Sequence, residues 1–411
     1  MEQTRKVWTV LTAVLVATIC VLTFAATQTR ADVKKPSVVN VAFISDMSGP
    51  YAAMTKSWAM GMKDAIEYVN DELNGVHGVP MKLIIRDTGG KVDAAVSNYM
   101  KLREMKPRPL FAGVVVSSEA EALKERAAED QIPILCPAAT SAIYPMAYNF
   151  AYFPLYVDQA GAFMDWLMDN WKKPRPPKIA FLCWDSTYGR AVFTDEVRNY
   201  AKKKGVEIVA EEVFGMRDVD VTTQLTRIKA KGADWVYSNS TASGPWTVAK
   251  GIKEMGYKVN MVTGCGSQAT NTLAAAPPGL MDGCYVVHFL RSFSDVNNPM
   301  MKKVRKYFEK KKRSEKDWGL GMLGGFWFVD TYREAISRAI RKVGWEGLNG
   351  KAVKEAMETY KDFMPIDATV YTYTSTKHSP EKIYMGRVKG KYVMPVSDWM
   401  VCPDLRPAKF K

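Results

Sequence analysis

The stretch GVVVSSEAE, residues 113–121, decides the fold, because an apolar β-branched run passes directly into a polar segment of helical character. Continuous apolar runs of this length are typical of strands buried on both faces of a parallel sheet. Such runs recur at Val38–Ile44, Met81–Ile85, Leu110–Val116, Ile132–Leu135, Lys178–Cys183, Trp235–Tyr237, Val259–Val262 and Cys284–Phe289. Between these runs, apolar residues recur every three or four positions, as expected for helices. One such stripe consists of Met62, Ala65, Ile66, Val69 and Leu73. The alternation predicts an α/β fold of doubly wound, Rossmann-like sheets, with a ligand site beyond the carboxyl ends of the strands.

The composition is that of a globular protein of about two domains. The chain has 411 residues, of which 47% are hydrophobic and 24% charged. Its 57 Lys and Arg against 43 Asp and Glu give a net charge of +14, which by itself does not choose between nucleic acid, anionic lipid and a solvated surface. Three histidines argue against a multi-histidine metal centre, and six cysteines are too sparse for a disulfide framework. We expect no metal and no cofactor.

The first 31 residues have the parts of a secretory signal peptide. Arg5 and Lys6 precede an uncharged apolar run, Val7–Ala26, and the segment ends at Thr29-Arg30-Ala31, just before Asp32. The alternative is a retained membrane anchor, since about 20 apolar residues can span a bilayer. A lipid-modified Cys20 is the weaker option, because bulky Ile19 precedes it. In each case the folded part lies outside the cytoplasm, in the periplasm, which argues against nucleic acid as a partner.

The alternation restarts after the proline-rich segment WKKPRPP, residues 171–177. This break predicts two sheets, at about 36–154 and 155–285, with the rest of the chain shared between them. We expect lobe 1 to contain residues 36–154 and 286–370, and lobe 2 to contain residues 155–285 and 371–411. A cleft between two α/β lobes follows from this arrangement.

Hydroxyl side chains follow two consecutive predicted strands of the first sheet. Ser117 precedes a predicted helix, and Ser118 with Glu121 has the spacing of a capping box. Thr140 stands in the same place after the next strand, behind Ala138 and Ala139. Because helix N-termini and neutral hydroxyls bind anions, these two strand ends together predict a cradle for a carboxylate.

Small polar residues and one aromatic residue end strands of the second sheet. WDSTYG, residues 184–189, contains Asp185 and Tyr188, an aromatic that could close over a ligand. Asn239 and Gly266 end two further strands, and Cys265 and Cys284 flank strands close enough to allow a disulfide. The segment GLGMLG, residues 319–324, matches a dinucleotide fingerprint poorly, because it follows a charged helix rather than a strand.

Taken together, these motifs resemble the leucine/isoleucine/valine-binding protein family of periplasmic receptors of ABC importers. The likeness is carried by SDMSGPY at residues 45–51, GMKDAI at 61–66, SS at 117–118, PAAT at 137–140, DSTYG at 185–189, IYMGRV at 383–388 and VSDW at 396–399. It implies two lobes joined by a hinge of three crossing strands, which close on the ligand.

The resemblance also implies roles for single residues. Ser117 and Thr140 are expected to bind the ligand carboxylate, the carbonyl of Ala138 its amine, and Tyr188 to cover it from the second lobe. Met54 stands where the family has a tyrosine, and Gly266 where amino-acid binders have an acidic residue. A ligand ammonium would therefore lack its usual carboxylate, unless Asp46, Asp185 or Glu119 takes that role. The predicted site comprises Ser117, Ser118, Ala138, Ala139, Thr140, Asp185, Tyr188, Asn239 and Gly266.

The sequence therefore predicts a non-enzymatic receptor. It would bind a small carboxylate-bearing molecule, an amino acid or a related compound, and deliver it to the permease of an ABC importer and, indirectly, to its ATPase. A ligand-sensing ectodomain of the same fold is the alternative. A secreted enzyme would need a nucleophile beside a base, and His77, His288 and His378 have no recognisable nucleophile partner in the sequence.

Overall fold

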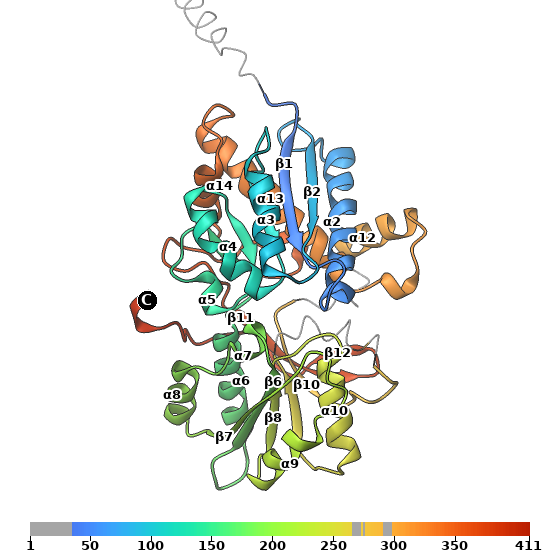
Figure 1. Cartoon of the computed structure of the whole chain (residues 1–411), viewed down its shortest axis with the longest axis vertical. Coiled ribbons are helices and arrows are strands. Elements are labelled where there is room, and N and C mark those ends of the chain that lie inside the picture. The colour runs from blue at the N-terminus through green and yellow to red at the C-terminus, as the bar shows by residue number, and fades with distance from the viewer. Residues whose placement is uncertain (1–34, 265–272, 274–275, 291–297) are drawn as a thin grey trace, which may run out of the picture.

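The structure is a computed structural model that describes residues 35–264, 273, 276–290 and 298–411. The predicted signal peptide, Cys265 and Gly266 lie outside the described residues. Two α/β bodies follow one another along the long axis of the molecule (Figure 1). We call the body that contains the first sheet lobe 1 and the other lobe 2.

Lobe 1 is built on a five-stranded parallel sheet in the order β2-β1-β3-β4-β5. Every residue of β1 is buried, as expected for a strand covered on both faces. The strands are β1 (Val39–Ser45), β2 (Met81–Asp87), β3 (Ala112–Val114), β4 (Ile134–Cys136) and β5 (Asn149–Ala151). Four of them were predicted from apolar runs, whereas β5 is too short to have a clear sequence pattern.

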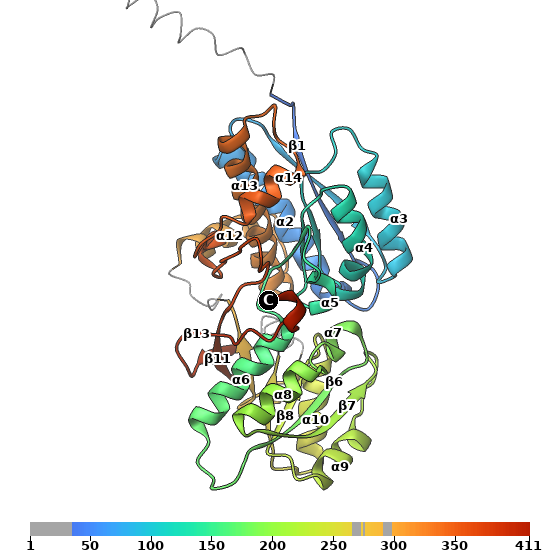
Figure 2. The ribbon, with the colours of Figure 1, turned by 90° about the vertical axis from the view of Figure 1, so that its left-hand side faces the viewer.

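Helices cover both faces of this sheet. Figure 2 shows α3 and α4 on one side of β1 and α2 and α13 on the other. The helices of lobe 1 are α2 (Ala52–Glu72), α3 (Val92–Arg103), α4 (Ser117–Glu129), α5 (Thr140–Ile143), α12 (Pro299–Lys310), α13 (Leu320–Val343) and α14 (Gly350–Met357). The predicted stripe of α2 is buried except for Leu73, which is 41% exposed because the helix has already ended at Glu72.

Lobe 2 has an eight-stranded mixed sheet in the order β12-β11-β10-β9-β8-β6-β7, with β13 paired to β11. The strands from β7 to β10 are parallel, and β11 and β12 add an antiparallel hairpin. The strands are β6 (Lys178–Trp184), β7 (Glu207–Phe214), β8 (Trp235–Ser238), β9 (Asn260–Thr263), β10 (Tyr285–His288), β11 (Lys382–Lys389), β12 (Tyr392–Pro395) and β13 (Met400–Val401). The helices are α6 (Tyr156–Asn170), α7 (Thr187–Arg190), α8 (Asp195–Lys204), α9 (Thr222–Ala230) and α10 (Gly244–Glu254).

Two features of lobe 2 go beyond the sequence predictions. The IYMGRV motif lies in β11, which forms a hairpin with β12 that turns at Gly390, a glycine with a φ of 60°. The half-buried strand β7 had no predicted counterpart, because its alternation of charged and apolar residues is weak. The lobe boundaries deduced from the sequence stay predictions.

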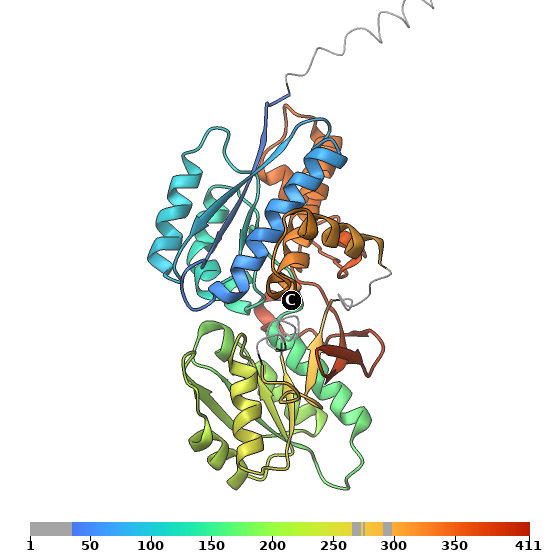
Figure 3. The same ribbon diagram turned by 90° about the vertical axis from the view of Figure 1, so that its right-hand side faces the viewer.

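Chain segments that cross between the lobes pack against one another at the joint. The rings of Phe153 and Phe289 lie 4.6 Å apart, and the Thr369 hydroxyl donates to the carbonyl of Phe289 at 2.8 Å. The Tyr371 hydroxyl donates to the carbonyl of Tyr152 at 3.1 Å. Figure 3 shows these crossings between the two bodies. Their side-chain contacts make the joint a packed hinge.

Close packing of α2 against α13 explains the glycine-rich segment that resembles a dinucleotide fingerprint. A Cβ atom on Gly321 would lie 1.7 Å from Ser57 Oγ, and one on Gly325 would lie 2.1 Å from the backbone nitrogen of Met62. The glycines therefore allow two helix backbones to touch, and this segment has a packing role.

Several cations in and after α12 form ion pairs with acidic residues of α2. Lys310 and Lys311 each pair with Glu67 at 2.6 Å, and Arg313 forms a two-pronged ion pair with Asp64, which is fully buried. These ion pairs hold the segment around α12 against α2. Among the described residues, no helix is long and apolar enough to cross a bilayer.

Candidate ligand-binding site

The two hydroxyl-bearing strand ends of lobe 1 lie side by side. Strands β3 and β4 are paired in parallel, with Gly113 opposite Leu135, so the segments that follow them leave the same edge of the sheet. Ser117 is the first residue of α4 and only 4% exposed, and Thr140 is the first residue of α5. The predicted pairing of these two turns is present in the structure.

The helix that begins at Ser117 has no side-chain cap. Its N-cap residue is Val116, so the predicted capping box between Ser118 and Glu121 is wrong. The chain leaves β3 at Val114, stays extended at Val116 and turns directly into the helix, which leaves Ser118 inside the first turn. The first backbone N–H groups of a helix have no partner within it, and here no side chain caps them.

Ala138 and Ala139 form the turn between β4 and α5. Both are buried, and the Ala138 carbonyl accepts a hydrogen bond from the backbone N–H of Tyr156 at 3.1 Å. One acceptor position of the carbonyl that the resemblance assigns to a ligand amine is therefore used within the protein. This bond fixes the turn to the start of α6, the first helix of lobe 2.

Tyr188 and Asn239 are held together at the corresponding edge of lobe 2. The Asn239 side-chain amide donates to the Tyr188 carbonyl at 2.8 Å, and the Tyr188 hydroxyl donates to the carbonyl of Ser240 at 3.2 Å. The Tyr188 ring lies 4.9 Å from that of Tyr156. Both predicted residues are buried, and their orientation is set by neighbouring backbone groups.

Asp185 does not join these buried residues. Its side chain is 55% exposed and pairs with the Arg190 Nε at 2.6 Å, and this hydrogen bond lowers the pKa of the Asp185 carboxyl. Gly266, the remaining predicted residue, lies outside the described residues.

Glu119 is a fully buried acid in the first turn of α4. Its Oε1 accepts a hydrogen bond from the Thr88 hydroxyl at 2.5 Å, and that hydroxyl accepts one from the backbone N–H of Gly90 at 3.2 Å. Burial raises the pKa of the Glu119 carboxyl to about 8, and the nearby charges of Asp46 and Asp87 act in the same direction.

The turn after β1 carries a side chain to the other lobe. Asp46 organises this turn by accepting the backbone N–H groups of Ser48, Gly49 and Tyr51. The Tyr51 ring meets the Trp184 ring of β6 edge-on at 6.2 Å. Burial raises the pKa of the Tyr51 hydroxyl to about 12, and the Ser186 side chain acts on it in the opposite direction. Residues after β1 and β6 therefore connect the two lobes directly.

Buried polar atoms without a hydrogen-bond partner lie on both sides of this connection. Within the described part of the chain they include Glu119 Oε2 and Thr140 Oγ1 in lobe 1, and Trp184 Nε1 and Asn239 Oδ1 in lobe 2. Native proteins leave few buried polar atoms unpaired, and a polar ligand between the lobes would supply partners. These atoms mark the junction as the candidate site.

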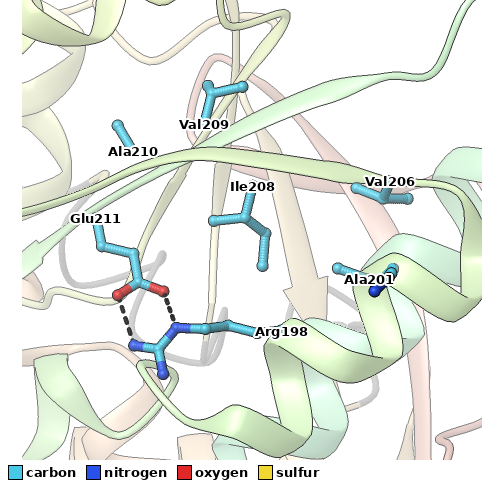
Figure 4. Close-up of a pocket in the computed structure, with 8 residues that line it drawn as sticks. Arg198, Ala201, Val206, Ile208, Val209, Ala210 and Glu211 are labelled. Carbon is cyan, nitrogen blue, oxygen red and sulfur yellow. Dashed lines mark hydrogen bonds and ion pairs between the residues drawn. The ribbon is translucent and has the colours of Figure 1, made fainter.

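A separate pocket of about 450 Å³ lies on lobe 2 (Figure 4). It is formed between α8 and the beginning of β7, where Arg198 makes two hydrogen bonds to Glu211. The candidate site is at the other end of this strand, because Phe214 at the end of β7 is paired with Trp184. None of the predicted site residues lines this pocket.

The contacts of His77 and Cys284 bear on the enzyme alternative and on the possible disulfide. His77 has a hydroxyl neighbour, since its Nε2 lies 2.9 Å from Ser337 Oγ, but Arg341 donates to the same oxygen at 2.7 Å. Cys284 carries a free thiol, with its Sγ 3.9 Å from Met261 Sδ, and Cys265 lies outside the described residues. Among the described residues, no group of three or more His, Cys, Asp or Glu side chains could hold a metal.

Sequence reasoning did not assign Tyr51 or Thr88 to the site. The resemblance places an aromatic residue at the position of Met54, but Met54 is buried in the core. Tyr51, at the end of the turn, contacts the second lobe instead. A tyrosine directly after the glycine and proline of a strand-end turn was the available signal. Thr88 had no signal, because its partner Glu119 is 31 residues away in the chain.

Comparisons with known proteins agree on one family. Residues 38–392 match the family model described as periplasmic binding protein. The Leu/Ile/Val-binding protein homolog 7 of Brucella suis biovar 1 (strain 1330) is 24% identical over 353 residues, which cover 82% of this chain and 84% of that protein.

Solved structures share the fold. A branched chain amino acid ABC transporter protein from Thermus thermophilus with bound valine superposes with a TM-score of 0.79 and 19% identity, covering 91% of this chain and 98% of that one. The fatty acid ABC transporter substrate-binding protein from Thermomonospora curvata superposes with a TM-score of 0.76 and 19% identity, covering 91% and 95%.

Proposed function

The chain belongs to the periplasmic binding protein family, and from this premise we propose that it captures a small carboxylate-bearing solute between its lobes and delivers it to the permease of an ABC importer. Members of the family bind solutes outside the cytoplasm and are not enzymes. We further propose that residues 1–31 direct export and are removed, and that the lobes have the boundaries predicted from the sequence.

The observation that carries the proposal is the unpartnered, buried hydroxyl of Thr140 beside the uncapped helix that begins at Ser117. An anion there accepts hydrogen bonds from two hydroxyls and from the free N–H groups of a helix N-terminus without needing a counter-cation. In our proposal Ser118, Ala138 and Ala139 complete the ligand-binding surface that Ser117 and Thr140 begin. We call this surface the lobe 1 wall.

Lobe 2 supplies the other half of the proposed site. Tyr188 and Asn239 cover the ligand, and Asp185 is left out because Arg190 already neutralises it. A ligand that contacts both lobes favours their closed arrangement by its difference in affinity for the two states, and the permease can recognise that arrangement. The proteins similar in fold include one with bound valine and one named for fatty acids, and both solutes have a carboxylate.

The test is a binding measurement on the mature chain. A thermal-shift screen of amino acids, aromatic acids, fatty acids, amides and urea finds the ligand, because binding raises apparent stability by mass action. Ser117→Ala and Thr140→Ala should each weaken binding by about tenfold without lowering the unliganded melting temperature. Ser141→Ala, which removes an exposed hydroxyl beside Thr140, is the control. Unchanged affinity in both site variants would refute the proposed cradle.

A further inference from the structure

We propose that Glu119 is a ligand-binding residue that acts as a neutral carboxylic acid, and that the ligand is a carboxylate without an ammonium group. The inference rests on the proposed function, because it names the ligand class for the same site. It depends on the direction of two hydrogen bonds, on the charges around Glu119 and on the donors that line the lobe 1 wall.

The hydrogen bonds at Thr88 determine which oxygen of Glu119 carries the proton. The Thr88 hydroxyl accepts the backbone N–H of Gly90, and the acceptor for its own proton, among the described residues, is Glu119 Oε1. A neutral carboxyl group then carries its proton on the other oxygen, Oε2. Oε2 is buried and has no partner in the described part of the chain. Glu119 can therefore donate an O–H to a ligand.

The charged groups that act on the pKa of Glu119 are acidic. Asp46 at the end of β1 and Asp87 at the end of β2 both raise its pKa, after burial, which has the largest effect. Tyr51, from the turn between them, keeps its proton because burial raises its own pKa to about 12. With a pKa of about 8, Glu119 is mostly protonated at pH 7.

The neighbouring cations have other partners. Arg190 of α7 is paired with Asp185, and the Lys124 ammonium of α4 binds the carbonyls of Ser141 and Tyr144. Lys56 on α2 is exposed to solvent. Since none of these three pairs with Glu119, its neutral form is the one that the site stabilises.

A wall of this kind selects the chemistry of its ligand. The hydroxyls of Ser117 and Thr140 and the O–H of Glu119 are donors, which suits the acceptor oxygens of a carboxylate. An ammonium group binds most strongly to an ionised acceptor, but Asp185 is paired outside the site, the Asp46 carboxylate already accepts three backbone N–H groups, and the Ala138 carbonyl already accepts the backbone N–H of Tyr156. A ligand without an amine matches this set of groups.

The experiment compares matched ligands by isothermal titration calorimetry on the mature chain. The pairs are 3-methylbutanoate and valine, 3-phenylpropanoate and phenylalanine, and octanoate and 2-aminooctanoate. We expect at least one amine-free acid to bind about tenfold or more tightly than its amino acid. Its affinity should fall about tenfold from pH 7 to pH 9, because the competent, protonated fraction of Glu119 falls by that factor. At pH 8, two buffers of different ionisation enthalpy should reveal proton uptake on binding.

Two variants of Glu119 test separately whether ligand binding needs its hydrogen-bond donor and whether it depends on its ionisation. Glu119→Gln keeps a neutral donor, so affinity at pH 7 should stay within about threefold and its decrease up to pH 9 should disappear. Glu119→Ala should weaken binding by about 10- to 100-fold, the usual effect of a lost hydrogen bond to a charged group. Glu121→Gln, an exposed acid on the same helix, is the matched control and should behave like the parent. If Glu119→Ala does not fold, Glu119→Gln and the pH series still decide.

Each contrary result has a defined meaning. If amino acids bind more tightly than the amine-free acids and Glu119→Gln abolishes that binding, Glu119 is an ammonium partner and the inference is wrong, while the proposed function stands. Loss of amine-free acid binding in Glu119→Gln also overturns the inference. If no member of either class binds, both the inference and the proposed carboxylate receptor fail.

Discussion

Replacing Asp158 with asparagine should make this protein more stable at neutral pH. Asp158 lies in α6 and is fully buried where the C-terminal segment passes over lobe 2. One of its carboxylate oxygens accepts the backbone N–H of Leu405 at 2.8 Å, and the other has no partner among the described residues. Burial raises the pKa of this carboxyl from 3.8 to about 7.

The size of the effect follows from this pKa. Between pH 4 and 7 the folded state keeps a proton that the unfolded state has lost, so the free energy of unfolding falls as the pH rises, and it is level above pH 7. A difference of about 3 units corresponds to about 4 kcal/mol at 1.36 kcal/mol per unit, as an upper estimate. In Asp158→Asn the side-chain amide oxygen would accept the same N–H from Leu405 without a charge, so the variant should avoid this loss.

The assay is urea unfolding of the parent and of Asp158→Asn at pH 4, 5, 6, 7 and 8. The free energy of unfolding of the variant minus that of the parent should rise by at least about 2 kcal/mol across this series. Asp234→Asn is the control of opposite sign, since hydrogen bonds from Arg175, the backbone of Lys178 and Lys173 lower the pKa of Asp234 to about 2. That variant should be less stable by about 1–2 kcal/mol throughout, because its cations are half exposed. A constant difference for Asp158→Asn would refute the reasoning.

Two further substitutions test contacts between distant parts of the chain. Tyr51→Ala removes the ring contact with Trp184, so ligand affinity should fall by about tenfold in calorimetry, while Tyr51→Phe keeps the ring and should lose less. Equal affinity in all three proteins would contradict a role in lobe closure. Arg313→Met leaves the buried Asp64 without its partner and should lower the free energy of unfolding, measured in urea, by about 3–5 kcal/mol. The double variant Arg313→Met, Asp64→Leu should recover most of this loss. A single variant as stable as the parent would show that the ion pair is not needed for stability.

The order of strands and helices could be read from local patterns. Runs such as Val38–Ile44 and Lys178–Cys183 correspond to strands in the structure, because a strand buried on both faces, as β1 is throughout and β6 is from Ile179 onward, is apolar at nearly every position. The pairing of the Ser117 and Thr140 turns could also be anticipated, since consecutive parallel strands release their following segments at one edge.

Local patterns were misleading where the outcome depended on a neighbour. The spacing of Ser118 and Glu121 fits a capping box, yet Val116 is the N-cap residue and α4 begins at Ser117, two residues before the start that an N-cap at Ser118 would give. The glycines at 319–324 resemble a nucleotide motif, but the close approach of α2 leaves Gly321 no room for a side chain.

The sequence by itself determined the alternation of elements, the two-lobed class and the family, because each depends on residues close together in the chain. Only the tertiary structure decided the electrostatics of the site. The contact of Thr88 with Glu119 and that of Tyr51 with Trp184 join residues 31 and 133 positions apart. Burial, hydrogen-bond direction and pKa depend on the groups that folding brings together, and no short-range pattern records them.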